Sequence, residues 1–453
     1  MKIFLGISKI ALAFTLLISY TYGNIKVINP RPLVDYFQTI YNSSSIPSVL
    51  AYFGLPPYGR SIIGQIENAD DPYGCRHTLI NTTSHEEPVP KFIIFDIGEC
   101  SNTLKVKYAQ DIGINCVILI NTDDSDLEKI NIYDDGIGYE IQIPTVIVNN
   151  RDGNKLRQAA LETKTEISIE FEMKRTYSIV QLDVWMSSDN LKVFDFLSDL
   201  HDMIHKIDFE LVKFRPGFVH WQCTECKAEN YTKSRADCLS GGRYCAVDPD
   251  NLGPISGRFV VEEDLREICL YSVVSTSKQY DLWFKYIKDY HKLCRSSFSN
   301  DCSKDLMNNL GLDYNQVQNC LRTSTEGNSI YINDNTLLRN ERNRWKQSGI
   351  QFYPAIVINN QTYRGNWESE EVCEAICASF ENMPKACINM EHNQNNEDIA
   401  SIGSVVGILL GMIALFAIAL AAYRYKVKQE MKKNMRREIN VQVSQYFSLQ
   451  EKY

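Results

Sequence analysis

The stretch from Lys91 to Asn121 reads KFIIFDIGECSNTLKVKYAQDIGINCVILIN and changes from a strand-like to a helix-like pattern and back. Its first and last portions are short runs rich in Ile and Val, which are typical of buried strands. Between them, Leu104, Tyr108 and Ala109 fall on one helical face, and Gly113 stands where a helix would end. The stretch therefore predicts a strand, a helix and a strand, which together form a βα unit.

Similar apolar runs continue on both sides of this unit, from Ser48 to about Glu172. They read SIIGQI before it, and QIPTVIVN and TEISIEFEM after it, with a further helix predicted from Gly153 to Glu162. The runs have the length and the Ile/Val content of strands and are separated by turns. We expect one β-rich domain over residues 24–175 that contains the βα unit.

A second domain is predicted over residues 176–390. SIVQLDVW at 178–185 alternates like a strand, residues 191–207 have helical periodicity, and ELVKF at 210–214 adds a strand. Near the end of the domain, GIQFYPAIVINNQTYRG at 349–365 predicts two strands joined by a turn. The domain is therefore expected to be of the mixed α and β class.

The two halves of this domain resemble a thioredoxin-like fold with a helical, cysteine-rich insertion at about 220–345. Pro354 stands at the position of that fold's cis-proline. Ser187, Ser188, Asp189 and Asn190 occupy the place of its Cys-x-x-Cys. Because no thiolate can form there, the resemblance implies no redox activity.

Both ends of the chain carry membrane-related patterns. Residues 1–23 contain two lysines, an apolar run and small residues, as a cleaved secretory signal does. Residues 402–423 carry no charge and are long enough to cross a hydrocarbon core of ~30 Å, and a basic segment follows them. We expect a multidomain type I membrane protein with one transmembrane helix, a luminal stalk at 391–401 and a cytosolic tail at 424–453.

The tail contains a tyrosine sorting pattern. Tyr446 is followed at the third position by Leu449, the YxxΦ form whose two side chains enter pockets of a clathrin adaptor. A chance match is the alternative, because bulky apolar residues are frequent. In the span, Gly403, Gly407 and Gly411 would let two helices approach closely, so a homodimer and a monomeric span with ordinary glycines both stay open.

Cysteines and sequons support a luminal location for residues between signal and span. All 14 cysteines lie between Cys75 and Cys387, as an oxidising compartment permits. The cysteines expected in disulfides are Cys75, Cys100, Cys223, Cys238, Cys245, Cys269, Cys294, Cys302, Cys320, Cys377 and Cys387. The N-x-S/T glycosylation sequons begin at Asn42, Asn81, Asn230 and Asn360.

The order of motifs in the first domain resembles a protease-associated (PA) domain, a binding or lid module without catalytic residues of its own. The matching motifs are PYGRSIIGQI, then FIIFDIGECSNTLKVKYAQDIGINCVILIN, then IPTVIV. Cys116 lies in an apolar strand and is expected to be a buried free thiol, which leaves Cys75–Cys100 as the bridge of this domain.

The cysteine-rich insertion carries a more specific resemblance than the PA domain does. HWQCTECKAENYTKSRADCLSGGRYCAVDPD, VVEEDLREICLYS and the later YPAIVINNQTYRG resemble, in this order, the central region of plant-type vacuolar sorting receptors. The resemblance extends from about Ser48 to Cys387. It implies soluble vacuolar or lysosomal cargo in the lumen, a clathrin adaptor on the tail, and residence in the Golgi, clathrin-coated vesicles and prevacuolar or endosomal compartments.

This chain departs from those receptors in two ways. Cys387 is followed by a short polar stalk rather than by calcium-binding EGF-type repeats. The cargo loop of the family usually reads DRGDCYF, whereas this chain has Ile97 in place of the arginine. The resemblance implies cargo binding by Asp96, Gly98, Glu99 and Cys100, and we expect Tyr58, Gly59 and Arg60 of the preceding strand to join them. Arg60 would then replace the missing cation, or would be an ordinary surface arginine.

Charge and missing motifs narrow the function classes. The formal net charge is −9 and is more negative outside the basic tail, so binding of nucleic acid is not expected. No G-x-S-x-G or H-E-x-x-H pattern occurs, and we expect no enzyme activity, metal or cofactor. The alternatives kept are a luminal thiol oxidoreductase, a protease-accessory protein and a passive membrane protein.

Two smaller features remain open. His201 and His205 lie one helical turn apart and would repel each other once protonated, so they could sense endosomal acidity, or could simply face solvent. Cys223 and Cys226 form a Cys-x-x-Cys, a pattern that occurs in zinc sites, in redox sites and in ordinary disulfides. Disulfides are favoured because no further pair with ligand spacing follows.

Overall fold

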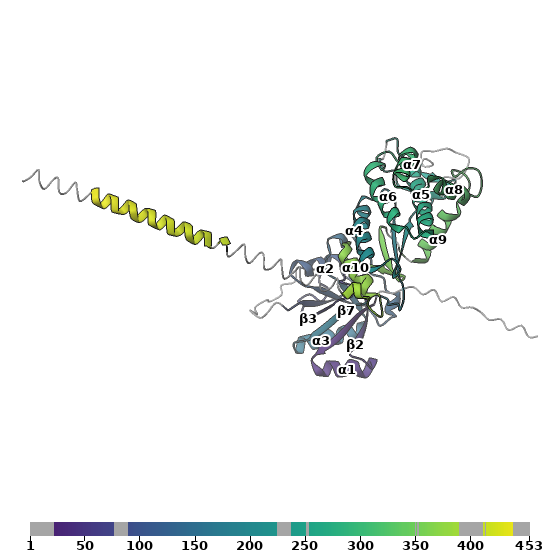
Figure 1. Ribbon diagram of the computed structural model, residues 1–453. Coiled ribbons are helices and arrows are strands. Elements are labelled where there is room, and N and C mark those ends of the chain that lie inside the picture. Colours follow the sequence, from purple (N-terminus) through teal and green to yellow (C-terminus); the bar gives the residue numbers. More distant parts are fainter. Residues whose placement is uncertain are drawn as a thin grey trace, which may run out of the picture. The chain divides into compact units, whose positions relative to one another are not determined.

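The structure is a computed structural model that describes residues 22–76, 89–223, 237–250, 253–348, 350, 353–388, 411–412 and 414–437. The chain divides into two compact units, Met1–Pro384 and Lys385–Tyr453. The first unit contains a β-barrel, a four-stranded sheet and a group of helices (Figure 1).

The barrel closes in the strand order β1-β2-β6-β5-β4-β3-β7. Its strands are β1 (Tyr22–Asn29), β2 (Ser45–Leu50), β3 (Ser61–Glu67), β4 (Lys91–Asp96), β5 (Cys116–Ile120), β6 (Thr145–Val148) and β7 (Glu166–Phe171). β7 closes the barrel because Ile169 pairs with Ile25 of β1 on one side and with Ile62 of β3 on the other. Ile25 and Ile169 are fully buried in the core.

Strands β3 to β6 run parallel, so their carboxyl ends meet at one edge of the barrel. Helices α2 (Asn102–Asp111) and α3 (Asn150–Glu162) follow β4 and β6 there. Ser101 caps α2 by accepting the Leu104 N–H, and Gly113, at φ +85°, turns the chain after it. Every residue of β5 is buried, and the predicted βα unit is confirmed.

The start of the barrel was not predicted. β1, α1 (Arg31–Tyr41) and β2 all precede residues 61–66, the first strand that the sequence predicts. β1 starts at Tyr22, within the predicted signal segment, and its long-range partner β7 is not visible in the local pattern. α1 is amphipathic and buries Leu33 and Phe37.

The second sheet has the order β13-β12-β8-β9. It contains β8 (Val180–Met186), β9 (Val212–Phe218), β12 (Ala355–Ile358) and β13 (Gln361–Tyr363), with helices α4 (Leu191–Ile207) and α10 (Ser369–Ala378). β8 and β9 are parallel and are joined through α4, whereas β12 runs antiparallel to β8. The Tyr353–Pro354 bond is cis. The predicted thioredoxin-like arrangement and its cis-proline are thus confirmed.

In its described residues, the insertion has five helices, which Figure 1 labels, and a small hairpin. They are α5 (Gly257–Thr276), α6 (Tyr280–Leu293), α7 (Asn300–Asn309), α8 (Tyr314–Ser324), α9 (Thr336–Ser348), β10 (Cys238–Leu239) and β11 (Tyr244–Cys245). Bridges join α5 to α8 (Cys269–Cys320), the end of α6 to α7 (Cys294–Cys302) and β10 to β11 (Cys238–Cys245).

All cysteines predicted to be bonded are in disulfides. Cys75–Cys100 is among them, with a Cα–Cα distance of 5.8 Å, so the predicted bridge of the barrel is confirmed. Cys116 is a buried free thiol, also as predicted. The other free cysteine of the described residues is Cys373, which is buried as well.

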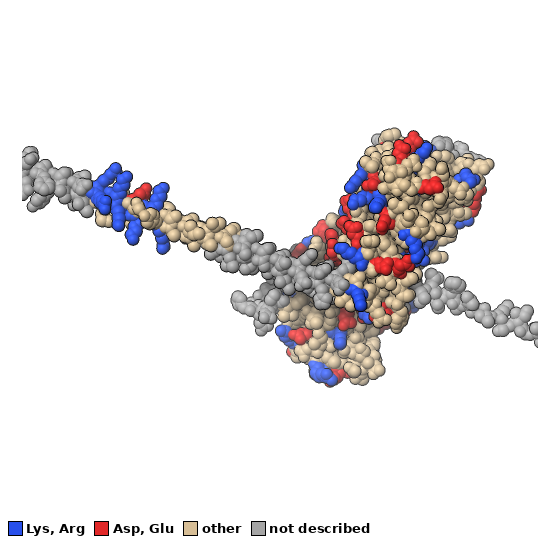
Figure 2. Space-filling model, in the orientation of Figure 1, with Lys and Arg blue, Asp and Glu red and all other residues tan. Residues whose placement is uncertain are grey.

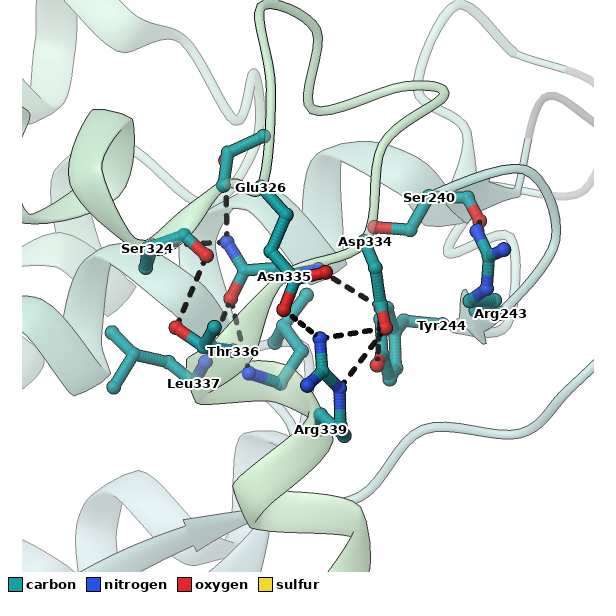
Figure 3. A network of polar contacts seen from close by, with 12 residues as sticks. Ser240, Arg243, Tyr244, Ser324, Glu326, Asp334, Asn335, Thr336, Leu337 and Arg339 are labelled. Carbon is teal, nitrogen blue, oxygen red and sulfur yellow. Dashed lines mark hydrogen bonds and ion pairs between the residues drawn. The ribbon is translucent and has the colours of Figure 1, made fainter.

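A polar network explains the GGRYC segment of the insertion (Figure 3). Tyr244 donates a hydrogen bond of 2.7 Å to Asp334, whose second carboxylate oxygen accepts from Arg339 on α9 at 3.0 Å. Asn335 caps α9 by accepting from the Leu337 and Leu338 N–H groups at 3.0 and 3.1 Å. The motif therefore fastens the disulfide hairpin to the start of α9.

No helix of the described residues is long and apolar enough to cross a membrane. Residues 414–437 are helical, but residues 402–410 and 413 of the predicted span lie outside the described residues. The predicted features that also lie outside them are residues 1–21 of the signal, the stalk, Asn81, Asn230, Cys226, Tyr446 and Leu449.

Candidate functional site

The predicted cargo loop lies at the carboxyl end of β4. Asp96 is the last residue of the strand and receives two hydrogen bonds, of 2.8 and 3.1 Å, from the guanidinium of Arg157 on α3. Gly98 and Glu99 both have positive φ, at +113° and +63°, and the disulfide at Cys100 anchors the end of the loop. Gly98 and Glu99 are exposed, so the tight turn presents them to solvent.

A buried lysine supports this loop from below. Lys105 on α2 is fully buried and donates to the backbone carbonyls of Asp96 and Gly98 at 2.7 and 2.8 Å. Burial lowers the pKa of Lys105, and the negative charge of Asp96 opposes that shift. Ile97, which replaces the arginine of the family, packs against the barrel core. The cation under the loop is therefore held by carbonyls and does not face solvent.

A carboxylate fixes the start of α2 beside the loop. Asp135 accepts hydrogen bonds from the Asn102 and Thr103 N–H groups at 2.7 and 3.1 Å and from the Ser101 hydroxyl at 2.8 Å. Burial alone would raise the pKa of Asp135, but the hydrogen bonds from Thr103 and Ser101 lower it overall. Asp135 stays ionised, which suits the positive end of the helix dipole.

The second predicted segment, Tyr58 to Arg60, does not join this loop. β3 and β4 pair in parallel with Gln65 opposite Lys91, so Arg60 lies before the amino end of one strand and Asp96 at the carboxyl end of the other. The offset of about ten residues corresponds to roughly 30 Å along the strands. Of the two alternatives kept for Arg60, this distance argues against a substitute for the cation missing from the Asp96–Cys100 loop.

Tyr58, Gly59 and Arg60 instead contact the thioredoxin-like part. The Arg60 guanidinium forms an ion pair with Glu374 of α10, and the Tyr58 and Tyr363 rings lie 5.2 Å apart. Gly59 has φ +81°, and a Cβ at this position would lie 2.7 Å from the Ala378 side chain of α10. Sequence reasoning missed α10 as a partner because its acidic positions carry no motif.

A cavity of about 400 Å³ lies at this junction. Residues near the amino ends of β3, β5 and β6 line it from the barrel side, including Arg60, Asn115 and Gln142. Residues of β13 and α10 and of the segment between them line the other side, namely Tyr363, Asn366, Glu371 and Glu374. The cavity therefore combines an apolar floor with amides, two carboxylates and one guanidinium.

The YRG hairpin holds the two parts together beside this cavity. Arg364 donates to the backbone carbonyls of Leu50 and Ala51, both at 3.0 Å, and its guanidinium lies 3.6 Å from the centre of the Tyr52 ring. Gln361 accepts a 2.7 Å hydrogen bond from the Lys174 N–H in the connection between the two sheets. The motif that resembles a family signature is thus a structural connector.

Comparisons with known proteins cover both parts of this unit. Residues 180–377 match the family described as vacuolar sorting receptor thioredoxin-like domain. Vacuolar-sorting receptor 7 of Arabidopsis thaliana is 27% identical over 395 residues, which cover 81% of this chain and 60% of that protein. Vacuolar-sorting receptor 1 of Pisum sativum is 24% identical over 377 residues, covering 77% and 59%. Over most of its length, this chain is similar to the plant vacuolar sorting receptors.

The chain spans about 60% of the length of the vacuolar sorting receptors that it matches. Among solved structures, a thiol-disulfide exchange protein of Wolbachia pipientis aligns with 45% of this chain and 83% of its own length, at 10% identity and a TM-score of 0.28. A zinc aminopeptidase of Bacillus subtilis aligns with 33% of this chain and 30% of its own length, at 18% identity and a TM-score of 0.23.

The thioredoxin-like part carries hydroxyls and acids where thiols would stand. Ser188 is buried, its N–H donates to Asp264 at 2.7 Å, and its hydroxyl donates to the Val260 carbonyl at 3.1 Å. Burial raises the pKa of the free Cys373 thiol to about 12, and Cys377 is disulfide-bonded. Neither cysteine has the low thiol pKa that exchange chemistry needs.

The two histidines and two of the glycosylation sequons lie within the described residues. His201 Nε2 lies 2.8 Å from Asp281 on α6, and its ring is stacked 6.2 Å from that of His205. His201 is therefore not on a solvated helix face, and its role in sensing pH stays a prediction. Asn42 and Asn360 are exposed, as acceptors of glycans must be.

Proposed function

We propose that this protein is a membrane-anchored receptor that sorts soluble cargo from the Golgi to vacuolar or lysosomal compartments. The observation that carries the proposal is the similarity to vacuolar-sorting receptors over 81% of the chain, through the barrel and the thioredoxin-like part together. A barrel alone would not be informative, because similar modules occur with unrelated functions. The protein acts as a binding protein and not as an enzyme.

The proposal includes a type I topology that is supported by the sequence. A signal at residues 1–23 and a span at residues 402–423 would place the barrel and the insertion in the lumen. Disulfides throughout the first unit are consistent with this location. Sequons at exposed Asn42 and Asn360 and the glycines of the span support a glycoprotein that is able to dimerise.

We also propose that cargo binds at two separate groups of residues. Asp96, Gly98, Glu99 and Cys100 form a disulfide-anchored loop with Gly98 and Glu99 exposed at its tip, the kind of rigid turn that can hold a ligand. Tyr58, Gly59 and Arg60 border the cavity at the junction. Loss of the chain should divert soluble hydrolases of the vacuole or lysosome to the medium. Unchanged delivery of all of them would contradict the receptor function.

The route depends on the tail. We expect Tyr446→Ala to remove the ring that fills the adaptor pocket, so that the receptor moves to the cell surface or the default route. Tyr425→Ala is the matched control, because the third residue after Tyr425 is Lys428 and not a bulky apolar residue. Imaging of the tagged full chain measures both. If Tyr446→Ala and Tyr425→Ala both kept the parental location, adaptor recruitment through this signal would be wrong.

The alternative of a luminal thiol oxidoreductase or protease-accessory protein is disfavoured by the buried serine at the thiol position. Insulin reduction by the full chain should stay at the uncatalysed rate. Turnover comparable with that of a thioredoxin would support the alternative.

A further inference from the structure

The cavity at the junction is formed by segments that lie far apart in the sequence. Its barrel side comes from residues 55–62, 115 and 142–144, and its other side from residues 363–374. A volume of about 400 Å³ lies within the range of small-molecule sites and is large enough for one or two side chains of a peptide. Because each part supplies one wall, the cavity exists only while both parts are joined.

The charges of the cavity are unbalanced. Two carboxylates, those of Glu371 and Glu374, and one guanidinium, that of Arg60, line it. Arg60 forms its ion pair with Glu374. Glu371 is exposed and accepts a long hydrogen bond of 3.4 Å from the Asn366 amide, which is a neutral donor. One negative charge therefore remains available to a ligand.

The neutral groups around this charge suit a peptide. The amides of Asn115, Gln142 and Asn366 can donate to and accept from a peptide backbone. Ile62, Ile143 and Pro144 provide apolar surface for the aliphatic stem of a long side chain. On the face of the first unit shown in Figure 2, basic and acidic side chains are interspersed, so a local pair and not a broad field would select the ligand.

We propose that this cavity binds an extended segment of a soluble cargo protein through one Lys or Arg side chain, which pairs with the carboxylate of Glu371. The proposal rests on the proposed receptor function and specifies what its cargo must carry. The cargo group would then be basic, whereas a free Arg60 would have selected an acidic one. Arg60 already forms an ion pair with Glu374 and is not available to a cargo carboxylate. Glu371 is exposed without a ligand, but a peptide seated in the cavity would cover it, and a charge-assisted pair shielded from water discriminates charge more strongly than an exposed pair does.

Selection from a phage-displayed random heptapeptide library tests this proposal. The full chain is solubilised in detergent and held on beads by a C-terminal tag. We expect the parent to enrich peptides with Lys or Arg, and Glu371→Lys to enrich peptides with Asp or Glu instead. For one synthetic winner, Glu371→Gln should weaken binding roughly tenfold. Glu370→Gln is the matched control, since Glu370 is an exposed neighbour that does not line the cavity.

A thermal melt of each variant, compared with the parent, identifies a folding defect. A variant that melts at a lower temperature is replaced by Gln142→Lys at the opposite wall. This substitution should also weaken the binding of basic peptides. Basic winners that bind the parent and Glu371→Lys equally would overturn this cavity and leave the receptor function standing. Acidic or uncharged winners from the parent would overturn the charge assignment. Failure of the receptor function would instead appear as unchanged hydrolase delivery in cells that lack the chain.

Discussion

At the scale of single residues, Glu267 of α5 is buried in an unusual way. It is fully buried, and neither carboxylate oxygen has a hydrogen-bond partner among the described residues. Burial raises the pKa of Glu267 well above its usual range, the nearby charge of Asp264 raises it further, and Arg266 opposes the shift. Glu267 should therefore be protonated in the folded protein.

This shift makes stability depend on pH. With a raised folded-state pKa, the contribution of Glu267 to the free energy of unfolding is complete below about pH 4.3 and is lost as pH rises through the folded pKa. Glu267→Gln should flatten the pH dependence between pH 5 and 7 and stabilise the fold at pH 7 by about 1–3 kcal/mol. Urea unfolding at several pH values measures this, with exposed Glu99→Gln as control. Equal slopes for Glu267→Gln and the parent would contradict the assignment.

At the scale of elements, the β10–β11 hairpin depends on Tyr244. This ring is almost fully buried and its hydroxyl donates to Asp334, which Arg339 also contacts (Figure 3). Tyr244→Phe removes a hydrogen bond to a charged group, and we expect a loss of about 1.5–3 kcal/mol in the free energy of unfolding. Tyr139→Phe, at an exposed position, should have no measurable effect. A loss below 0.5 kcal/mol for Tyr244→Phe would show that the network does not hold the hairpin.

Elements with strong local patterns were predictable from the sequence. The strands around Lys91–Asn121 and helix α4 have clear periodicity, and the predicted bounds of α4 match the observed Leu191–Ile207. β1 was missed because its alternation follows an apolar leader and its pairing with β7 depends on residues more than a hundred positions away. Local patterns therefore predict elements better than they predict how a barrel closes.

At the scale of the whole molecule, the relative direction of β3 and β4 determines whether Arg60 and Asp96 can belong to one site. Parallel pairing places Arg60 and Asp96 at opposite ends, and no local pattern in a single sequence reveals that direction. The cavity could not be predicted from local patterns either, because Glu371 and Glu374 lie on a helix some 300 positions from Arg60. Two candidate surfaces therefore replace the single one predicted, and whether they act together depends on how firmly the barrel and the thioredoxin-like part are joined.

Arg364 provides a direct test of that connection. It is the residue of the thioredoxin-like part that donates to Leu50 and Ala51 of the barrel and stacks on Tyr52. Arg364→Ala removes two charge-assisted hydrogen bonds and a cation–π contact, so we expect a loss of roughly 2–3 kcal/mol in the free energy of unfolding.

Calorimetry of the full chain should show one transition for the first unit in the parent and two in Arg364→Ala. Arg31→Ala, at an exposed i,i+4 ion pair, should keep one transition. A single, unshifted transition in Arg364→Ala would mean that other contacts join the parts. If two transitions appear, binding of basic peptides should weaken together with the coupling, because the walls of the cavity would no longer be held in place.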